Sequence, residues 1–221
     1  MSQTGGIAEF HALISATPSA LEHAGLVQGT GSPRAARFGM TPAWLRADVE
    51  ALNQQLIVAA PVKTLAGKSI DPLKGAKPVV MFFTTNDCPV ANKMVPEILR
   101  ITNDYKGKVR FLMVYTDPQS TLQELKTHQE DYQLKSIPGT HDHNHILVRA
   151  ADAKITPEAA ILINGKAVYR GRINNYYEDF GKPRSVITQH DLRIAIDAVL
   201  AGKPAPAPRG ESIGCYITKL K

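Results

Sequence analysis

Hydrophobic positions in the middle of the chain switch between continuous apolar runs and helical spacing. Residues 78–84 and 109–115 are almost wholly apolar, which predicts two strands that are buried on both faces. Residues 89–105 and 119–132 carry apolar side chains at helical intervals, and each segment follows one of these runs. Strands that alternate with helices in this way predict an α/β protein.

The pattern changes after residue 140. Residues 144–151 are predicted to form a short helix. Residues 159–163 and 167–170 are predicted to pair as a hairpin, because Asn164-Gly165 between them is typical of a type I′ turn. An antiparallel hairpin added to parallel strands predicts an α/β sandwich with a mixed central sheet.

A last helix is expected to close the domain. Its start is placed at Thr188, with Asp191 three residues on as a capping-box variant, and its end at Gly202. The chain is therefore expected to divide into a helical N-terminal extension (1–55), a main domain (56–202) and an extended Pro/Ala-rich tail (203–221). Residues 56–65 are predicted to form the first strand of the main domain.

Composition and charge exclude several classes of protein. The 221 residues are 43% hydrophobic and 21% charged, which is ordinary for a folded globular chain. The net charge of +6 comes mainly from the last quarter, where loops and prolines separate the basic residues; this favours a solvated basic surface over a nucleic-acid interface. No apolar run is long enough for membrane insertion. No signal peptide is visible, which predicts a cytoplasmic protein as written, or an exported one if the chain is a mature form.

Only two cysteines are present, Cys88 and Cys215, which excludes a disulfide-rich scaffold and a four-cysteine zinc site. Cys88 follows the most apolar strand and stands at the start of the next helix. Backbone N–H groups and the positive end of the helix dipole stabilise a thiolate there, while the charge of Asp87 opposes it. The sequence therefore favours a reactive thiol; the alternative is a small buried hydrophobic residue.

The chain resembles the thioredoxin-like superfamily, in particular its AhpC/TSA–redoxin branch. The resemblance covers about residues 56–200 and rests on Cys88, on Pro96 eight residues later, and on Thr156-Pro157 before a strand. It implies a three-layer α/β/α sandwich and a cis-proline at Pro157 that faces the cysteine. The stretch from 155 to 217 is also similar to bacterial redoxin-domain proteins that are often exported.

The chain departs from the better-known redox families. Ala91 stands where thioredoxins have their second cysteine, so a dithiol confined to that motif is excluded. Thr85 matches the Thr or Ser that peroxiredoxins carry three residues before their cysteine, but Met81 replaces their proline. Their active-site arginine would fall near Thr156, and the candidates to replace it are Arg170 and Arg172.

Cys215 lies 127 positions after Cys88, beyond a Pro/Ala spacer long enough to let it reach the active site. It is a candidate resolving thiol for a disulfide or sulfenic acid formed at Cys88. The alternatives are a static disulfide and an unrelated packing residue.

The histidines of His141-Asp142-His143-Asn144-His145 form the other candidate site. A strand would place all three on one side and a helix would pair His141 with His145, so either could bind a metal such as copper. Copper chaperones of the thioredoxin-like class use cysteine and histidine ligands, but with a two-cysteine motif that is absent here. A polar loop with Asn144 at the helix start is the favoured interpretation.

The sequence thus predicts a thiol-based oxidoreductase, or antioxidant enzyme, without a cofactor. Cys88 is the expected nucleophile, Thr85 its hydrogen-bond partner and Cys215 the resolving thiol. Thr156, Pro157 and Arg172 are expected to line the substrate groove. The expected partners are a protein thiol or disulfide, or a peroxide, and a thiol reductant. The alternatives are a metal-binding protein and a redox-inactive chaperone-like protein.

Overall fold

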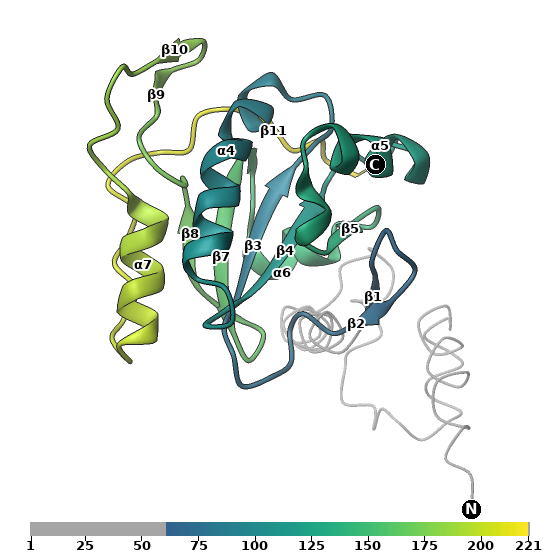
Figure 1. Cartoon of the computed structure of the whole chain (residues 1–221), viewed down its shortest axis with the longest axis horizontal. Coiled ribbons are helices and arrows are strands. Elements are labelled where there is room, and N and C mark those ends of the chain that lie inside the picture. Colours follow the sequence, from purple (N-terminus) through teal and green to yellow (C-terminus); the bar gives the residue numbers. More distant parts are fainter. Residues whose placement is uncertain (1–60, 221) are drawn as a thin grey trace, which may run out of the picture. The chain divides into compact units, whose positions relative to one another are not determined.

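A mixed sheet of five strands forms the centre of the computed structural model, which describes residues 61–220 (Figure 1). The strand order is β5–β4–β3–β7–β8. Strands β3, β4 and β5 are parallel, β7 is antiparallel to β3, and β8 is antiparallel to β7. These strands are β3 (Val79–Thr84), β4 (Arg110–Tyr115), β5 (Gly139–His141), β7 (Glu158–Ile163) and β8 (Lys166–Gly171).

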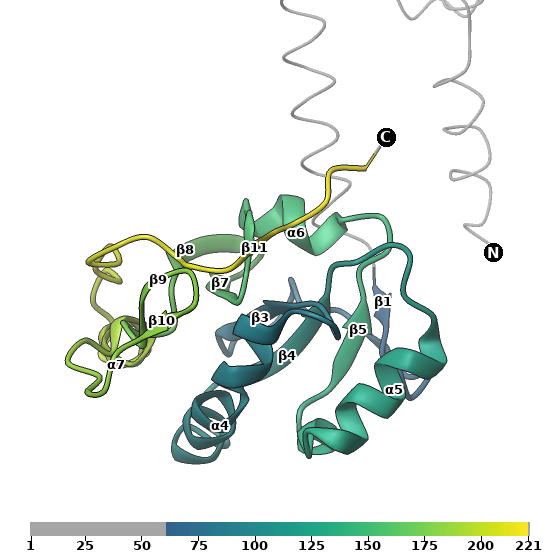
Figure 2. The ribbon, with the colours of Figure 1, turned by 90° about the horizontal axis from the view of Figure 1, so that it is seen from above.

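Helices cover both faces of this sheet. Helices α4 and α5 lie on one side and α6 on the other, as Figure 2 shows, and α7 packs in the same apolar cluster as α4. Side chains of β3 alternate between the two clusters: Val80 and Phe82 enter the first, and Met81 and Phe83 the second. The strand reads as one apolar run because both of its faces are buried. The helices are α4 (Pro89–Asp104), α5 (Leu122–Asp131), α6 (Ile146–Ala151) and α7 (Asp191–Leu200).

Smaller elements surround the central sheet. Three antiparallel pairs of short strands and one 3₁₀ turn complete the described part of the chain. None of the helices within residues 61–220 is long and apolar enough to cross a membrane. The pairs are β1 (Val62–Lys63) with β2 (Ser69–Ile70), β6 (Ile155–Thr156) with β11 (Cys215–Tyr216), and β9 (Tyr177–Asp179) with β10 (Lys182–Pro183); the turn is η2 (Leu134–Ser136).

The expected fold class, an α/β sandwich with a mixed central sheet, is confirmed. The two apolar runs form β3 and β4, and the segments after them form α4 and α5. Asn164 and Gly165 both have positive φ, 50° and 78°, as a type I′ turn requires. All described elements belong to the second of the two units into which the chain divides, Ala51–Lys221. The helical extension expected for residues 1–55 lies outside the described residues.

The capping box expected at Thr188 is wrong. Helix α7 begins at Asp191 after the N-cap His190, which makes no side-chain capping bond. Thr188 instead belongs to a loop held by Asn175, whose amide oxygen accepts the Thr188 backbone N–H at 3.0 Å. The Asp191 carboxylate is thereby free to bind other groups.

Candidate active site

Cys88 is the N-cap of α4 and its side chain points into the protein. The sulfur lies 3.5 Å from the backbone N of Ala91, which donates to it, and 3.4 Å from the carbonyl oxygen of Thr156. Pro89 occupies the first turn, where its missing N–H costs no hydrogen bond. The end of a buried strand and the start of a helix thus fix the sulfur at a terminus with free N–H groups.

The C-terminal tail brings Cys215 to the same place. Strand β11 pairs antiparallel with β6, with Cys215 opposite Thr156 in the register. The sulfurs of Cys88 and Cys215 are 3.0 Å apart and both thiols are free. The Thr156–Pro157 peptide bond beside them is cis. Two cysteines separated by 127 positions are therefore in contact.

Apolar groups close the site around Cys88, whose exposed fraction is only 2%. Val90 and Ala91, both buried, pack with it, and Tyr177 of β9 and Cys215 cover the cluster from outside. A thiol this well covered is reached from solvent only when the covering groups move.

The surroundings of Cys215 disfavour ionisation of its thiol. Burial is the largest cause that raises the pKa of Cys215, followed by the hydrogen bond and the negative charge of Cys88 and the charge of Asp87; together they raise it to about 12. A raised pKa keeps the Cys215 thiol protonated near neutral pH.

Thr85 is not among the hydrogen-bond partners of the Cys88 sulfur in the described part of the chain. Its carbonyl oxygen accepts from the hydroxyl of Thr84 at 3.2 Å, and the sulfur takes its partners from the helix and the tail. The expected hydrogen bond between Thr85 and Cys88 is therefore not found, because the N-cap geometry turns the thiol towards Ala91.

The two candidate arginines face carboxylates. Arg172 donates from Nε to Asp191 at 2.9 Å, and Arg170 lies 3.2 Å from the buried Glu158. Arg172 lines a small cavity together with Pro157, which it shares with residues of the tail. It thus lies at the edge of the expected groove, under the tail, and its charge is already paired.

The three histidines are bound to backbone. Ring nitrogens of His141, His143 and His145 lie 2.7–3.1 Å from carbonyl oxygens of residues 116–118, so each ring spends an N–H group on the loop after β4. Within residues 61–220 no group of three or more His, Cys, Asp or Glu side chains is placed to bind a metal. The three histidines therefore hold the loop after β4 in place.

The sequence-based reasoning missed Glu158 and Ser212. Glu158 is 3% exposed in the apolar strand β7, and its carboxylate accepts from the Ser212 hydroxyl at 3.1 Å. An ionisable residue at the head of an apolar strand was the available signal, because such a group is buried only when it is paired.

The strand order and the place of Cys88 are those of a thioredoxin-like fold. A cysteine at the junction of the central strand and the next helix faces an X–Pro bond that precedes an antiparallel strand.

Comparison with solved structures found chains of similar fold. An uncharacterized conserved protein of Geobacillus kaustophilus is 27% identical, with a TM-score of 0.60 over 72% of this chain and 88% of its own. A hypothetical protein of Sinorhizobium meliloti 1021 is 24% identical, with a TM-score of 0.60 over 72% of this chain and 89% of its own. A secreted disulfide oxidoreductase of Mycobacterium tuberculosis is 16% identical, with a TM-score of 0.47 over 65% of this chain and 98% of its own. No protein-family model matches the sequence, and no curated protein matches it.

Proposed function

We propose that the chain is a thiol-disulfide oxidoreductase that acts on protein disulfides through Cys88 and Cys215. The observation that carries the proposal is the 3.0 Å contact between the two sulfurs, at a helix N-terminus and beside a cis-proline. A disulfide bond is about 2.05 Å long, so a small movement joins the pair. In this proposal Cys215 takes the place of the second cysteine that Ala91 does not provide.

The reaction proceeds in two exchanges. The Cys88 thiolate attacks one sulfur of the substrate disulfide, forms a mixed disulfide and releases the other sulfur as a thiolate. Cys215 then loses its proton to solvent or to that leaving group, and its thiolate attacks the Cys88 sulfur. The second substrate thiolate leaves, so the substrate gains two electrons and the cysteine pair becomes a disulfide. A thiol reductant returns the pair to its reduced form.

The pKa of Cys215 depends on the state of Cys88, and this dependence favours one order of the two exchanges. Two of the causes that raise the pKa of Cys215, the hydrogen bond and the charge of Cys88, disappear once Cys88 is bound in the mixed disulfide. The pKa of Cys215 therefore falls once Cys88 has reacted, so its thiolate forms more easily for the second exchange. Such an order prevents the two thiols from competing for the substrate.

Two segments that pack against Cys88 carry exposed aromatic side chains, which favours a protein as the substrate. Tyr216, directly after Cys215, is 84% exposed, and Phe180, in the turn that follows the strand of Tyr177, is 61% exposed. Apolar groups exposed beside a covered thiol suit contact with a protein surface. A peroxide is disfavoured, because Arg170 and Arg172 both face carboxylates instead of the sulfur.

The stoichiometry of a small aromatic disulfide, 5,5′-dithiobis(2-nitrobenzoate), tests the proposal. The reduced wild type releases two equivalents of aromatic thiolate per chain and ends with a Cys88–Cys215 disulfide that mass spectrometry identifies. Cys215→Ser, the matched variant, releases one equivalent and keeps the mixed disulfide on Cys88. The proposal is overturned by a stable mixed disulfide on the wild type, or by a Cys88→Ser variant that reacts as fast as the wild type.

A further inference from the structure

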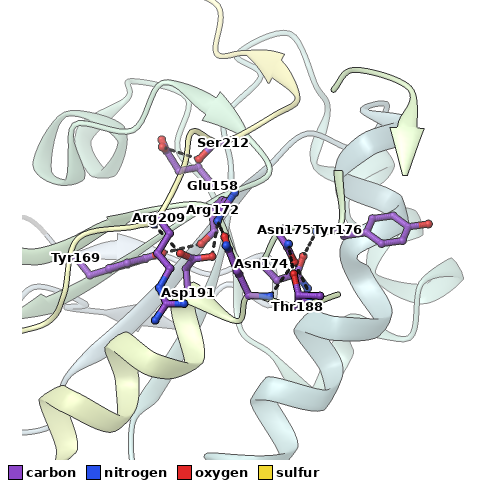
Figure 3. A network of polar contacts seen from close by, with 11 residues as sticks. Glu158, Tyr169, Arg172, Asn174, Asn175, Tyr176, Thr188, Asp191, Arg209 and Ser212 are labelled. Carbon is purple, nitrogen blue, oxygen red and sulfur yellow. Dashed lines mark hydrogen bonds and ion pairs between the residues drawn. The ribbon is translucent and has the colours of Figure 1, made fainter. Parts of the chain in front are cut away.

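The segment that carries Cys215, residues 204–217, crosses the domain and is bound to it along its length. We call this segment the strap. Figure 3 shows its polar contacts with the domain: the backbone N–H of Arg209 lies 2.7 Å from Asp191, and the Ser212 hydroxyl lies 3.1 Å from Glu158. Each contact ends on a carboxylate that is at least 95% buried. Buried charges of this kind are costly unless they are fully paired, so their partners are held firmly.

Asp191 of α7 joins the strap to Arg172, the residue after β8. One carboxylate oxygen accepts from Arg209 of the strap, and the other accepts from Nε of Arg172 at 2.9 Å. Arg172 also contacts the side-chain oxygen of Gln189 and lies against Gly210 of the strap, where a side chain would meet the guanidinium at 2.6 Å. The strap thus fits around this ion pair.

Glu158 holds the strap closer to the thiols. Its carboxylate accepts from the Ser212 hydroxyl, from the backbone N–H of Lys154 at 2.9 Å, and from Arg170 at 3.2 Å. Glu158 directly follows the cis-proline, Pro157. The same carboxylate therefore ties together the strap, the loop before β6 and the β7–β8 pair.

Close backbone packing also holds the strap against β6. A Cβ atom at Gly214, the residue before Cys215, would lie 2.0 Å from the carbonyl oxygen of Thr156. Only glycine allows the strap to approach β6 closely enough for the β11–β6 pairing. Gly214 and the two carboxylate contacts therefore hold the strap in one position on the domain.

The seated strap has opposite effects on the two exchanges. It keeps Cys215 at 3.0 Å from Cys88, which favours the second exchange. It also contributes to covering Cys88, which opposes the first exchange, since a substrate disulfide must reach that sulfur. The strap must therefore lift for the first step and return for the second.

We propose that Glu158 and Asp191 are positioning residues that latch the strap, and that the latch sets both the effective concentration of Cys215 and the access to Cys88. This inference rests on the proposed function of the two cysteines. A weaker latch raises the population of the lifted strap, so it speeds the attack at Cys88 and lowers the stability of the Cys88–Cys215 disulfide.

Two measurements on the full chain test this inference. The first is the equilibrium constant of the Cys88–Cys215 disulfide in glutathione buffers, and the second is the rate at which iodoacetamide alkylates Cys88 in the reduced protein, read by peptide mass spectrometry. Ser212→Ala removes one hydrogen bond to a buried carboxylate and lowers the equilibrium constant about tenfold. Gly214→Ala prevents the strap from approaching β6 and lowers the equilibrium constant ~100-fold. Alkylation of Cys88 rises in both variants.

The controls are Ser136→Ala, at an exposed position, and Asp197→Asn, on the same helix as Asp191 but bonded to Tyr105. Neither control is expected to change either quantity. A latch variant that lowers the equilibrium constant and also slows alkylation, or that changes neither quantity, overturns the latch while the two-cysteine reaction stands. A wild type that forms no Cys88–Cys215 disulfide at any glutathione ratio overturns the proposed function itself.

Discussion

Replacement of Cys88 by serine is expected to make Cys215 ionise more readily. The pKa of Cys215 is raised to about 12 first by burial, then by the hydrogen bond to Cys88 and by the Cys88 and Asp87 charges. Cys88→Ser leaves the burial in place but removes the thiolate. The pKa of Cys215 should therefore fall but stay above that of a free thiol.

The size of this fall follows from the distance between the sulfurs. Two unit charges 3.0 Å apart repel each other by about 1.4 kcal/mol in a medium with the dielectric constant of water, which corresponds to about one pKa unit. Cys215 is only partly exposed, so the local dielectric constant is lower and the repulsion larger. We expect a fall of at least one unit.

Alkylation of Cys215 by iodoacetamide between pH 7 and 10 measures this change. In the wild type the rate should rise about tenfold per pH unit throughout, because the thiolate fraction is small over the whole range. In Cys88→Ser the same rates should be reached at least one pH unit lower. Asp87→Asn, which removes the weakest of the four causes, should give a smaller displacement. Superimposable curves for the wild type and Cys88→Ser would refute the coupling of the two thiols.

Two further predictions concern the stability of the domain. Burial lowers the pKa of His128, whose ring contacts Tyr115 and Asn92, so the unfolded chain binds more protons as the pH falls through about 6.5. The free energy of unfolding should therefore decrease from pH 7.5 to 5.5 in urea titrations, and a His128→Asn variant should lose part of this slope; an equal slope in both would contradict the assignment. Phe82→Ala should lower the free energy of unfolding by about 3–5 kcal/mol at neutral pH, because Phe82 is 1% exposed and stacks on Phe111; a loss below about 1 kcal/mol would show that the core rearranges to fill the cavity.

The long periodic segments could be predicted from the sequence because their signals are local. Residues 78–83 are all apolar and Val79–Thr84 form β3, and Pro89 at the start of α4 marks the helix that Cys88 caps. Strand β5 was not predicted, because Gly139–His141 is short and owes its extended form to pairing with β4. Short strands of this kind depend on neighbours that are distant in the sequence.

The two cysteines of the candidate site differ in the same way, since the position of one is set locally and that of the other by distant contacts. The place of Cys88 follows from one strand and one helix, so the sequence was sufficient to find it. The place of Cys215 depends on β11, on the glycine before it and on two buried carboxylates far from it in the chain. Asp191 has a spacing that suggests a helix cap, and only the fold shows that its carboxylate binds Arg172 and the strap. Contacts that join three distant segments leave no periodic signal in a sequence.

The separation of the two thiols along the chain has a mechanical consequence. Once Cys88 and Cys215 are joined, the chain from one to the other, a separation of 127 positions, forms a covalent ring that contains four of the five strands of the central sheet. A force applied to the ends of the chain then passes through the sulfur bridge, and about 430 Å of chain, at about 3.4 Å per residue, cannot be drawn out. Strand β3 lies before Cys88 and is the only strand of that sheet on the loaded path. The redox state of one pair of sulfurs thus decides how much of the domain can be unravelled by pulling.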